Sequence, residues 1–581
     1  MSRNGYKAQG LTDPVSARRL HNDGAVIFRA LSVEVLRIVV SHLAIEAEKL
    51  WQEGVFNITP GLSLSHACSR WREIAITTPD IWTIIPLTNT KWARECLSRS
   101  QTLPIRFLAD PSDSERAKQL SLKQLERVQM LVTEQEDDDD EGCPALWASA
   151  PVLEYMRIMF AFPSERQPAA FSNFFGGQAP PRLREVSITS AALCGPTIPF
   201  LRARTIKSLN FSCCTLWNTL EDMLDTLSCV PELEELMLEY STIIINRPSS
   251  WDPRPSIDMA ASPTFIPLQL AHLRNLWFKT DFFQAALVLR HISLPQDIHT
   301  LGLQIIDGCP MDRVGDYYKA LFLPTLSPIL HEFSEQPLSS RRLAFTLSSG
   351  SFDIMASKPL RPGVVLSRYA GRHHVITNDR AGDGSFLRLQ FRYNSLTESG
   401  YSLLESVAET APALFSVGSL TLKGDLDEAL ALSEVAWPTA LRHMHVAEHL
   451  ELDCGGSVGF VYHGSVSWIE QNQPHTLCLR NVTLDTTTGF NNPEDFEESQ
   501  KETFFDLVRE KVMRPWLKSN ALKRVIVRDC PLQPWMLDEL EALVDKEGVD
   551  WDHVFRGQGV VEGKRAPYDA ELSSDPDDDE Y

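Results

Sequence analysis

The sequence lacks any long apolar run and any concentrated group of basic residues. Nowhere do about 18 apolar residues follow one another, and the first residues lack the apolar segment of a secretion signal. We therefore expect no membrane partner and a location in the cytoplasm, the nucleus or both. The net charge is −22, and because nucleic-acid binding requires a concentrated lysine and arginine surface, we expect no nucleic-acid partner.

Motifs of catalysis, metal binding and nucleotide binding are also missing. The 11 cysteines include no C-x-x-C pair, and their odd number and scattered positions suit neither a zinc site nor a disulfide framework. The sequence contains no Walker-type Gly-Lys-Ser/Thr, no G-x-S-x-G and no H-E-x-x-H. We therefore predict that the protein is not an enzyme and binds no cofactor and no metal. A hydrolase or transferase would need a pocket of converging polar side chains.

An apolar helical pattern opens the part of the sequence that we expect to be ordered. From Leu31 to Leu43 apolar residues recur at helical spacing, which predicts an amphipathic helix with one apolar stripe. The pattern returns between Leu64 and Ala75, and Pro79 ends it before the large side chain of Trp82. Three short helices cannot bury a sizeable core alone, so we expect much of their apolar surface to face something else.

These helices resemble an F-box. The family opens with Leu-Pro-x-Glu-x-Leu-x-x-Ile-Phe-x-x-Leu, and the residues that fall in step with this pattern are Leu31, Glu34, Leu36, Val39, Val40 and Leu43. A later helix of the family carries a small apolar residue, Cys, then Trp three positions on and a Leu-Trp pair after that. The corresponding residues are Ala67, Cys68, Trp71 and Ile81-Trp82. Ser32 replaces the usual Pro and suits a helix N-cap, and the connection from Ala44 to Gly61 is longer than in the family.

The resemblance implies that the helices bind the Skp-type adaptor subunit of a cullin-RING (SCF-type) ubiquitin ligase, while the rest of the chain binds an unidentified protein substrate. The predicted docking residues come from the matching positions and the apolar stripe beside them. They are Leu31, Val35, Leu36, Val39, Leu43, Leu64, Cys68, Trp71 and Trp82. The alternative is an interaction scaffold of leucine-rich-repeat-like units whose first helices form a terminal cap, with no role in ubiquitin ligation.

A short strand pattern recurs after the helices. The unit L-x-x-L-x-L, in which any apolar residue replaces Leu, first appears as Leu125/Val128/Met130 and last as Leu522/Val525/Val527, mostly at intervals of roughly 20 to 40 residues. Its period of two places the second and third apolar residues on one face of a strand. Helical patterns lie between some units, for example at 216–227, 282–290 and 504–513. The array resembles a degenerate leucine-rich repeat, and the alternative is an ordinary α/β domain.

The predicted fold class is therefore α/β, with a small N-terminal three-helix F-box module followed by a leucine-rich-repeat-like βα solenoid with parallel strands. The predicted parts of the chain are a disordered N-terminus at 1–26, the F-box helical module at 27–100, the solenoid with long loops at 101–556 and a disordered acidic tail at 557–581.

Substrate contacts are predicted on the side of the strands that faces away from the core. Residues beside the inward-facing positions alternate to that side. They give a candidate set of Tyr155, Arg157, Asn275, Trp277, His443, His445 and Arg524. Trp277 is the predicted main anchor, because a large aromatic side chain supplies much contact area unless a loop covers it.

Overall fold

The structure of the chain is a computed structural model that describes most of residues 31–551. The residues within this range that it leaves out are 53–59, 110–112, 136–143, 161–170, 194–197, 240–241, 245–266, 296–297, 306–318, 320–322, 336–341, 349–350, 358–384, 393–405, 410, 424–440, 454–460, 462–467, 469–470, 473–474, 481–503, 519–521, 529, 531 and 545–547. The predicted disordered segments, 1–26 and 557–581, lie outside the described residues.

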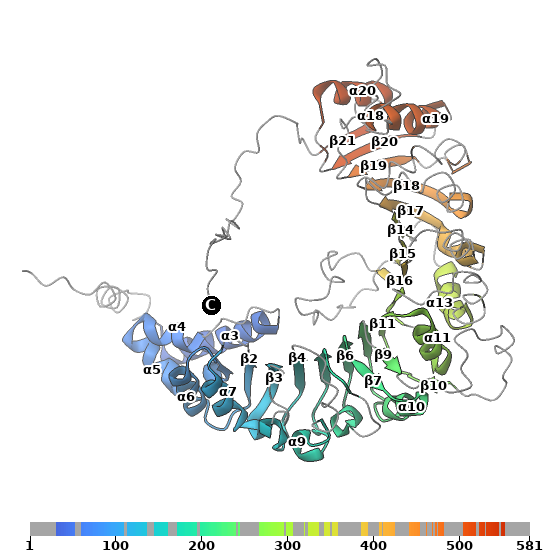
Figure 1. Cartoon of the computed structure of the whole chain (residues 1–581). Coiled ribbons are helices and arrows are strands. Elements are labelled where there is room, and N and C mark those ends of the chain that lie inside the picture. The colour runs from blue at the N-terminus through green and yellow to red at the C-terminus, as the bar shows by residue number, and fades with distance from the viewer. Residues whose placement is uncertain are drawn as a thin grey trace, which may run out of the picture. The chain divides into compact units, whose positions relative to one another are not determined.

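The chain divides into two compact units (Figure 1). Unit 1 comprises Met1–Leu343 and Gly350–Ser416, and unit 2 comprises Ala344–Ser349 and Val417–Tyr581. Strand β14 (Arg342–Ser348) contains the first boundary between them, and β17 (Ser416–Lys423) contains the last.

Unit 1 begins with a group of helices where the sequence predicts them, but the first helix continues to Gln52, into the expected connection from Ala44 to Gly61. The elements are α3 (Val33–Gln52), α4 (Pro60–Ala67), α5 (Ser69–Thr77), the 3-10 helix η1 (Pro79–Trp82), strand β1 (Ile84–Ile85) and α6 (Thr90–Arg99). The Val35 N–H donates to Ser32 Oγ at 3.3 Å, so Ser32 caps α3 as predicted. Asn89 caps α6 by accepting from the Lys91 N–H at 2.8 Å.

Trp82 holds these helices together. Its side chain is buried, and its indole N–H donates to the Ala75 carbonyl oxygen at 2.7 Å. The Arg99 guanidinium lies 4.3 Å from the centre of the indole ring on one side. Gly61 approaches the ring so closely that a Cβ at this position would lie 3.0 Å from Trp82 Cε3. Trp82 therefore links α4, α5 and α6 into one small core.

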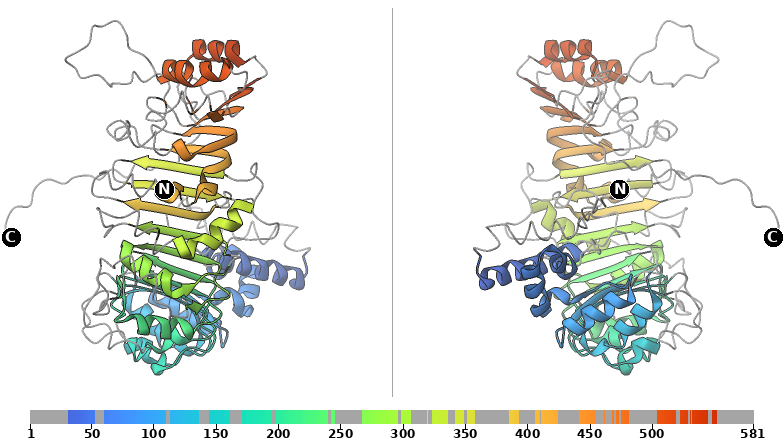
Figure 2. Two further views of the ribbon diagram at one scale, coloured as in Figure 1. Left: turned by 90° about the vertical axis from the view of Figure 1, so that its right-hand side faces the viewer. Right: turned by 90° about the vertical axis from the view of Figure 1, so that its left-hand side faces the viewer.

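The sheet of unit 1 is built by strands that follow one another in the sequence (Figures 1 and 2). After β1 they are β2 (Ile105–Ala109), β3 (Val128–Gln135), β4 (Tyr155–Phe160), β5 (Glu185–Thr189), β6 (Ser208–Ser212), β8 (Glu235–Glu239), β11 (Asn275–Thr280), β13 (Thr300–Ile305) and β16 (Ser385–Arg392). Each pairs in parallel with its neighbour in this order. Strand β15 (Ser351–Ser357) then pairs antiparallel with β16.

Shorter elements connect these strands and cover one face of the sheet. The helices are α7 (Glu115–Leu122), α9 (Phe174–Gly177), α10 (Leu220–Ser228), α11 (Phe282–His291) and α13 (Leu323–Glu335), with 3-10 helices η2 (Leu125–Arg127), η3 (Pro144–Trp147), η4 (Pro199–Arg202) and η8 (Pro412–Phe415). Two short parallel pairs are β7 (Thr215–Trp217) with β9 (Thr242–Ile244), and β10 (Leu268–Gln269) with β12 (Ile292–Ser293). Figure 1 shows α7, α10 and α11 on the same side of the strands.

The apolar positions of the strand pattern face these helices. On β6 and β8, for example, Leu209, Phe211, Leu236 and Leu238 are buried, and the residues between them are partly exposed. The predicted helix at 282–290 is confirmed by α11. The predicted helix at 216–227 begins only at Leu220, because Thr215–Trp217 pair with β9 as strand β7.

Strand β3 departs from the predicted alternation. The register shifts by one residue between Ile105 and Arg106 of β2, so that Leu131 pairs with Phe107 on the core face. Met130 pairs with Arg106 and lies on the other face, where it contributes to an apolar cluster with Ile84 and Val132. The assignment of Met130 to the same face as Val128 is therefore wrong, because one extra residue reverses the side to which a strand residue points.

Unit 2 repeats the arrangement on a smaller scale. Its parallel strands are β18 (His445–Asp453), β19 (Thr476–Arg480), β20 (Arg524–Arg528) and β21 (Val549–Trp551), paired in that order. Helix α18 (Phe504–Leu507) continues through a π-helical turn, η9 (Val508–Met513), into α19 (Arg514–Lys518), where the sequence predicts a helix at 504–513. Helix α20 (Pro534–Val544) packs against β20 and β21. The chain is thus a mixed α/β protein with a large sheet of mainly parallel strands.

Candidate functional site

The predicted docking residues divide into a buried set and an exposed set. Four are core residues of the helical group, namely Leu36, Cys68, Trp71 and Trp82. Three are exposed on α3, namely Val35, Val39 and Leu43. Leu31 and Leu64 are half-buried. The structure therefore brings all nine into one helical group, but only some of them present a surface to a partner.

Helix α3 buries one row of apolar side chains and exposes another. Leu36 is 1% exposed and Val40, one turn later, is also buried. The Arg70 guanidinium donates to the Leu31 carbonyl oxygen at 2.6 Å, which ties the start of α3 to α5. Figure 2 shows α3, in dark blue, projecting from the strands of unit 1. A helix can bury only one stripe against its neighbours, so the second apolar row of α3 remains open.

We name four exposed apolar residues of this helix the outer face of α3. They are Val35, Ile38, Val39 and Leu43, and Ile38 is 58% exposed. Val33 and Ile45 are also exposed, Val33 on another side of the helix and Ile45 at the margin of this face. Glu34, Arg37 and Ser41 share a different, polar side of the helix, as their spacing predicts. An exposed apolar patch bordered by polar residues is typical of a protein-binding surface.

Ile38 is absent from the predicted docking set, although it belongs to the apolar pattern of its segment. The family motif does not match position 38, whereas it matches the buried Leu36. The periodicity of the segment indicated it, because Ile38 follows Val35 by three residues, which places both on one side of a helix.

The predicted substrate residues of unit 1 lie on the face of the sheet opposite the core. Tyr155 and Arg157 of β4 are half-buried and alternate with buried Met156 and Ile158. Asn275 of β11 is likewise half-buried beside buried Leu276. Alternation along the strands therefore places these side chains as predicted.

Trp277 points to the same face as Asn275 but is only 7% exposed. It pairs in register with Gly302 of β13, and a Cβ on that glycine would lie 1.6 Å from Trp277 Cε3. The indole ring therefore occupies the space above the glycine. Trp277 offers little surface to a substrate in this arrangement, and its role as an anchor stays a prediction.

The predicted substrate residues of unit 2 do not form one group. His445 begins β18 and is exposed, whereas His443 precedes the strand and is half-buried. Arg524 of β20 lies in register with Thr476 of β19, which pairs with His449 and not with His445. The Arg524 guanidinium donates to an Asp550 carboxylate oxygen at 2.8 Å, so this arginine is already ion-paired.

Two glutamates on the outer side of unit 1 were not among the predicted residues. Glu185 of β5 and Glu235 of β8 occupy the position of the strand pattern that Tyr155 and Asn275 occupy. Burial, with a smaller contribution from the negative charge of Glu235, raises the pKa of the Glu185 carboxyl to about 7, against the lowering effect of the Arg184 charge. Burial also raises the pKa of Glu235, against the lowering effect of a hydrogen bond from Ser208. Their position in the repeat was the available sequence signal.

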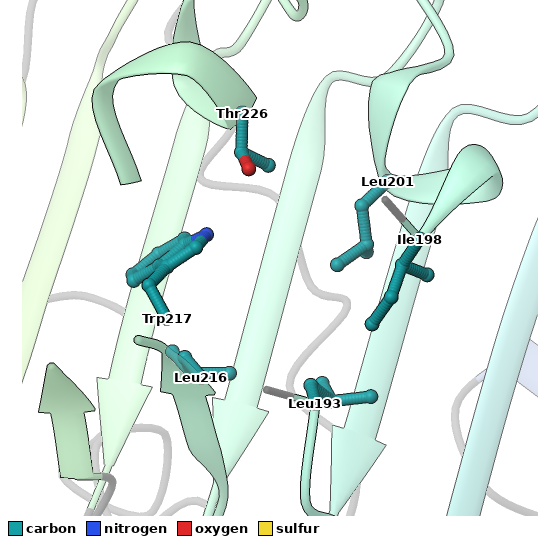
Figure 3. A pocket seen from close by; sticks show the side chains of 6 residues that line it. All are labelled: Leu193, Ile198, Leu201, Leu216, Trp217 and Thr226. Atoms are coloured by element: carbon teal, nitrogen blue, oxygen red, sulfur yellow. The ribbon is translucent and has the colours of Figure 1, made fainter. Parts of the chain in front are cut away.

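A small, almost entirely apolar cavity lies among the described residues of unit 1. The cavity between η4, β7 and α10 has a volume of only about 10 Å³, the lower limit for one water molecule (Figure 3). Its lining is almost entirely apolar and consists of Leu193, Ile198, Leu201, Leu216, Trp217 and Thr226. Within the described ranges no three His, Cys, Asp or Glu side chains lie close enough to share a metal ion. No helix in that part of the chain is long and apolar enough to cross a membrane.

Comparison with known proteins provides no family for the chain. No protein-family model matches the sequence, and no curated protein is significantly similar to it.

Proposed function

We propose that the chain is the substrate-recognition adaptor of an SCF-type cullin-RING ubiquitin ligase. Its N-terminal helices act as an F-box that binds the Skp-type adaptor subunit, and its strands form a leucine-rich-repeat-like solenoid that binds a protein substrate. The chain itself performs no catalysis in this proposal, and its place is the cytoplasm, the nucleus or both. The observation that carries the proposal is the exposed outer face of α3 beside a well-packed helical core.

Some residues of the family motif are buried and others are exposed, and this difference supports the proposed function. Leu36 and Trp82 are motif residues that hold the helices in place, whereas Val39 and Leu43 are motif residues that remain exposed. The hydrogen bond from the Trp82 indole to Ala75 fixes the helices before any partner binds. A rigid apolar surface loses little conformational freedom on binding, which favours affinity.

The outer face of α3 is large enough to matter energetically. Complete burial of a Val, Leu or Ile side chain contributes roughly 1.5 to 3 kcal/mol. Binding costs entropy, so these contributions do not add up to the affinity, but losing one central side chain should weaken a complex clearly. Ile38 is the most suitable test residue, because at 58% exposure it does not belong to the core of the helical group.

Replacing Ile38 by Asp should weaken docking strongly without unfolding the chain. We expect the wild-type chain, co-expressed with the Skp-type adaptor subunit, to elute from a gel-filtration column as a one-to-one complex. Ile38→Asp should weaken binding by about 100-fold, because the new charge loses its water at the interface. Ser41→Asp is the matched control, since it adds the same charge on the polar side of the same helix.

Circular dichroism of each variant establishes that the fold is intact. Equal binding by the Ile38→Asp variant would contradict docking through the outer face of α3. A folded wild-type chain that forms no complex would favour the alternative, an interaction scaffold with no role in ubiquitin ligation.

A further inference from the structure

We propose that unit 1 binds a substrate segment in which an acidic side chain lies two or three residues from a large apolar one. The apolar side chain packs on a small apolar cluster of the first strands, and the carboxylate accepts hydrogen bonds from Arg157. This inference rests on the proposed role of the sheet as a substrate-binding surface and names the chemistry of the segment that it binds.

The face of the sheet opposite the core carries an apolar cluster on its first four strands, which lie side by side (Figure 1). We name it the outer cluster, and its members are Ile84 of β1, Leu108 of β2, Met130 and Val132 of β3, and Tyr155 of β4. Register places them on one face, since Val132 pairs with Leu108 and Met130 pairs with Tyr155. The outer cluster is therefore separate from the core beneath the sheet.

The apolar character of this face ends at β4. At the same positions β5 and β6 carry polar residues, namely Glu185, Ser187, Ser208 and Asn210. Three members of the outer cluster are buried, whereas Leu108 and Tyr155 keep part of their surface exposed. An apolar side chain of a partner that covers Leu108 and Tyr155 removes further apolar surface from water, which favours binding.

Arg157 stands at this border and lacks an acceptor. It follows Tyr155 on β4 by two residues, so its side chain leaves the same face of the sheet, and it pairs in register with Val132 of the outer cluster. Arg157 Nε is buried and finds no hydrogen-bond partner among the described residues, and the guanidinium forms no ion pair with them. A buried donor without an acceptor costs free energy, which a bound acceptor recovers.

Two glutamates lie diagonally across from Arg157 in the sheet, but neither forms an ion pair with it. Glu185 of β5 pairs with Tyr155, and Glu134 of β3 pairs with Met159. Burial raises the pKa of Glu185 to about 7, so this carboxyl is only partly ionised near neutral pH, and the cation that opposes the shift is Arg184. Arg157 therefore remains available to an acidic ligand.

The spacing of the strands sets the spacing of the two side chains in the bound segment. Val132 lies one strand and Leu108 two strands from Arg157, which is about 5 to 10 Å. Residues two or three apart on an extended segment span about 7 to 10 Å, so one segment that crosses the strands reaches both places. A wholly apolar segment leaves the Arg157 guanidinium without an acceptor, and a basic one adds repulsion. A carboxylate at Arg157 instead gains charge-assisted hydrogen bonds.

Selection from a random dodecapeptide library displayed on phage tests the inference. We expect peptides selected on the full wild-type chain to share Asp or Glu two or three residues from a large apolar residue. Synthetic copies of these peptides should bind the Arg157→Gln variant at least about 10-fold more weakly, because the variant lacks the charge that holds the carboxylate. The matched control is Arg182→Gln, which removes the same charge at an exposed position before β5 and should leave binding unchanged.

Charge reversal separates a direct contact from a general change in potential. Peptide copies in which Lys replaces the shared acid should bind the Arg157→Glu variant more tightly than they bind the wild-type chain. Circular dichroism verifies that every variant is folded. Selected peptides without a shared acid, equal binding by Arg157→Gln, no gain for the lysine copies, or a selection that yields no binders would overturn the inference. These measurements need no ligase subunit, so their failure is distinguishable from a failure of docking through α3.

Discussion

Replacing Gly302 by Ala should lower the free energy of unfolding by about 3 kcal/mol, as expected for overpacking at a close contact. The new Cβ would lie 1.6 Å from Cε3 and 2.0 Å from Cζ3 of Trp277. The indole ring is buried, so it has little room to move away. Urea denaturation followed by circular dichroism measures the effect. Ser187→Ala, at a half-buried position on the same face of β5, is the control and should change stability by less than about 0.5 kcal/mol.

A double-mutant cycle determines whether the Trp277 ring causes the destabilisation by Gly302→Ala. Trp277→Ala alone should cost about 3 to 5 kcal/mol, because it removes a large buried side chain. Once the ring is absent, Gly302→Ala should add less than about 1 kcal/mol, since the clash no longer exists. Additive effects of the two substitutions would contradict the close contact between Trp277 and Gly302. Strong coupling would confirm the contact, and the cost of Trp277→Ala alone would show how far Trp277 stabilises the sheet without a substrate.

The second large effect concerns the buried row of α3. Leu36→Ala should destabilise the helical group by about 2 to 5 kcal/mol, because Leu36 is 1% exposed and its truncation leaves a cavity. Val39→Ala, three residues later on the exposed row, should change stability by less than about 0.5 kcal/mol. Limited proteolysis and urea denaturation of both variants provide the comparison. If Val39→Ala proved the more harmful, the helix would bury the opposite row.

The contrast between buried Leu36 and the exposed residues of α3 determines which substitutions can test docking. An Asp at position 36 would place an unpaired carboxylate in the core, which costs several kcal/mol unless the helices unfold. Loss of a complex in that variant would report unfolding and not a lost contact. Ile38 and Val39 avoid this ambiguity because their side chains are exposed.

The sequence predicted the helices at 31–82 and most of the strand positions, because both depend on local periodicity. It did not reveal which row of α3 is buried. Leu36 with Val40 and Val35 with Val39 are both apolar pairs one turn apart, and only the positions of α5 and η1 select the first pair. Periodicity cannot distinguish two apolar stripes on one helix when the neighbouring helices are unknown.

The same limit applies to the strands. Alternation placed Tyr155, Arg157 and Asn275 on the outer face, but the shift in β2 and β3 moved Met130 to the face opposite the predicted one. The burial of Trp277 depends on Gly302, which a later strand provides, so the strand pattern around Trp277 did not indicate it. Contacts between residues distant in the sequence thus account for the two differences between the predicted and the observed strands, at Met130 and at Trp277.

Site-specific cross-linking tests the central claim most directly. A photoreactive benzoylphenylalanine replaces Ile38 in one sample and Arg37, on the polar side of α3, in another, and each protein is irradiated with purified Skp-type adaptor subunit. The account predicts a covalent product of the two chains from position 38 and little or none from position 37. Equal yields from both positions, or no product from position 38 with a folded protein, would contradict docking through the outer face of α3.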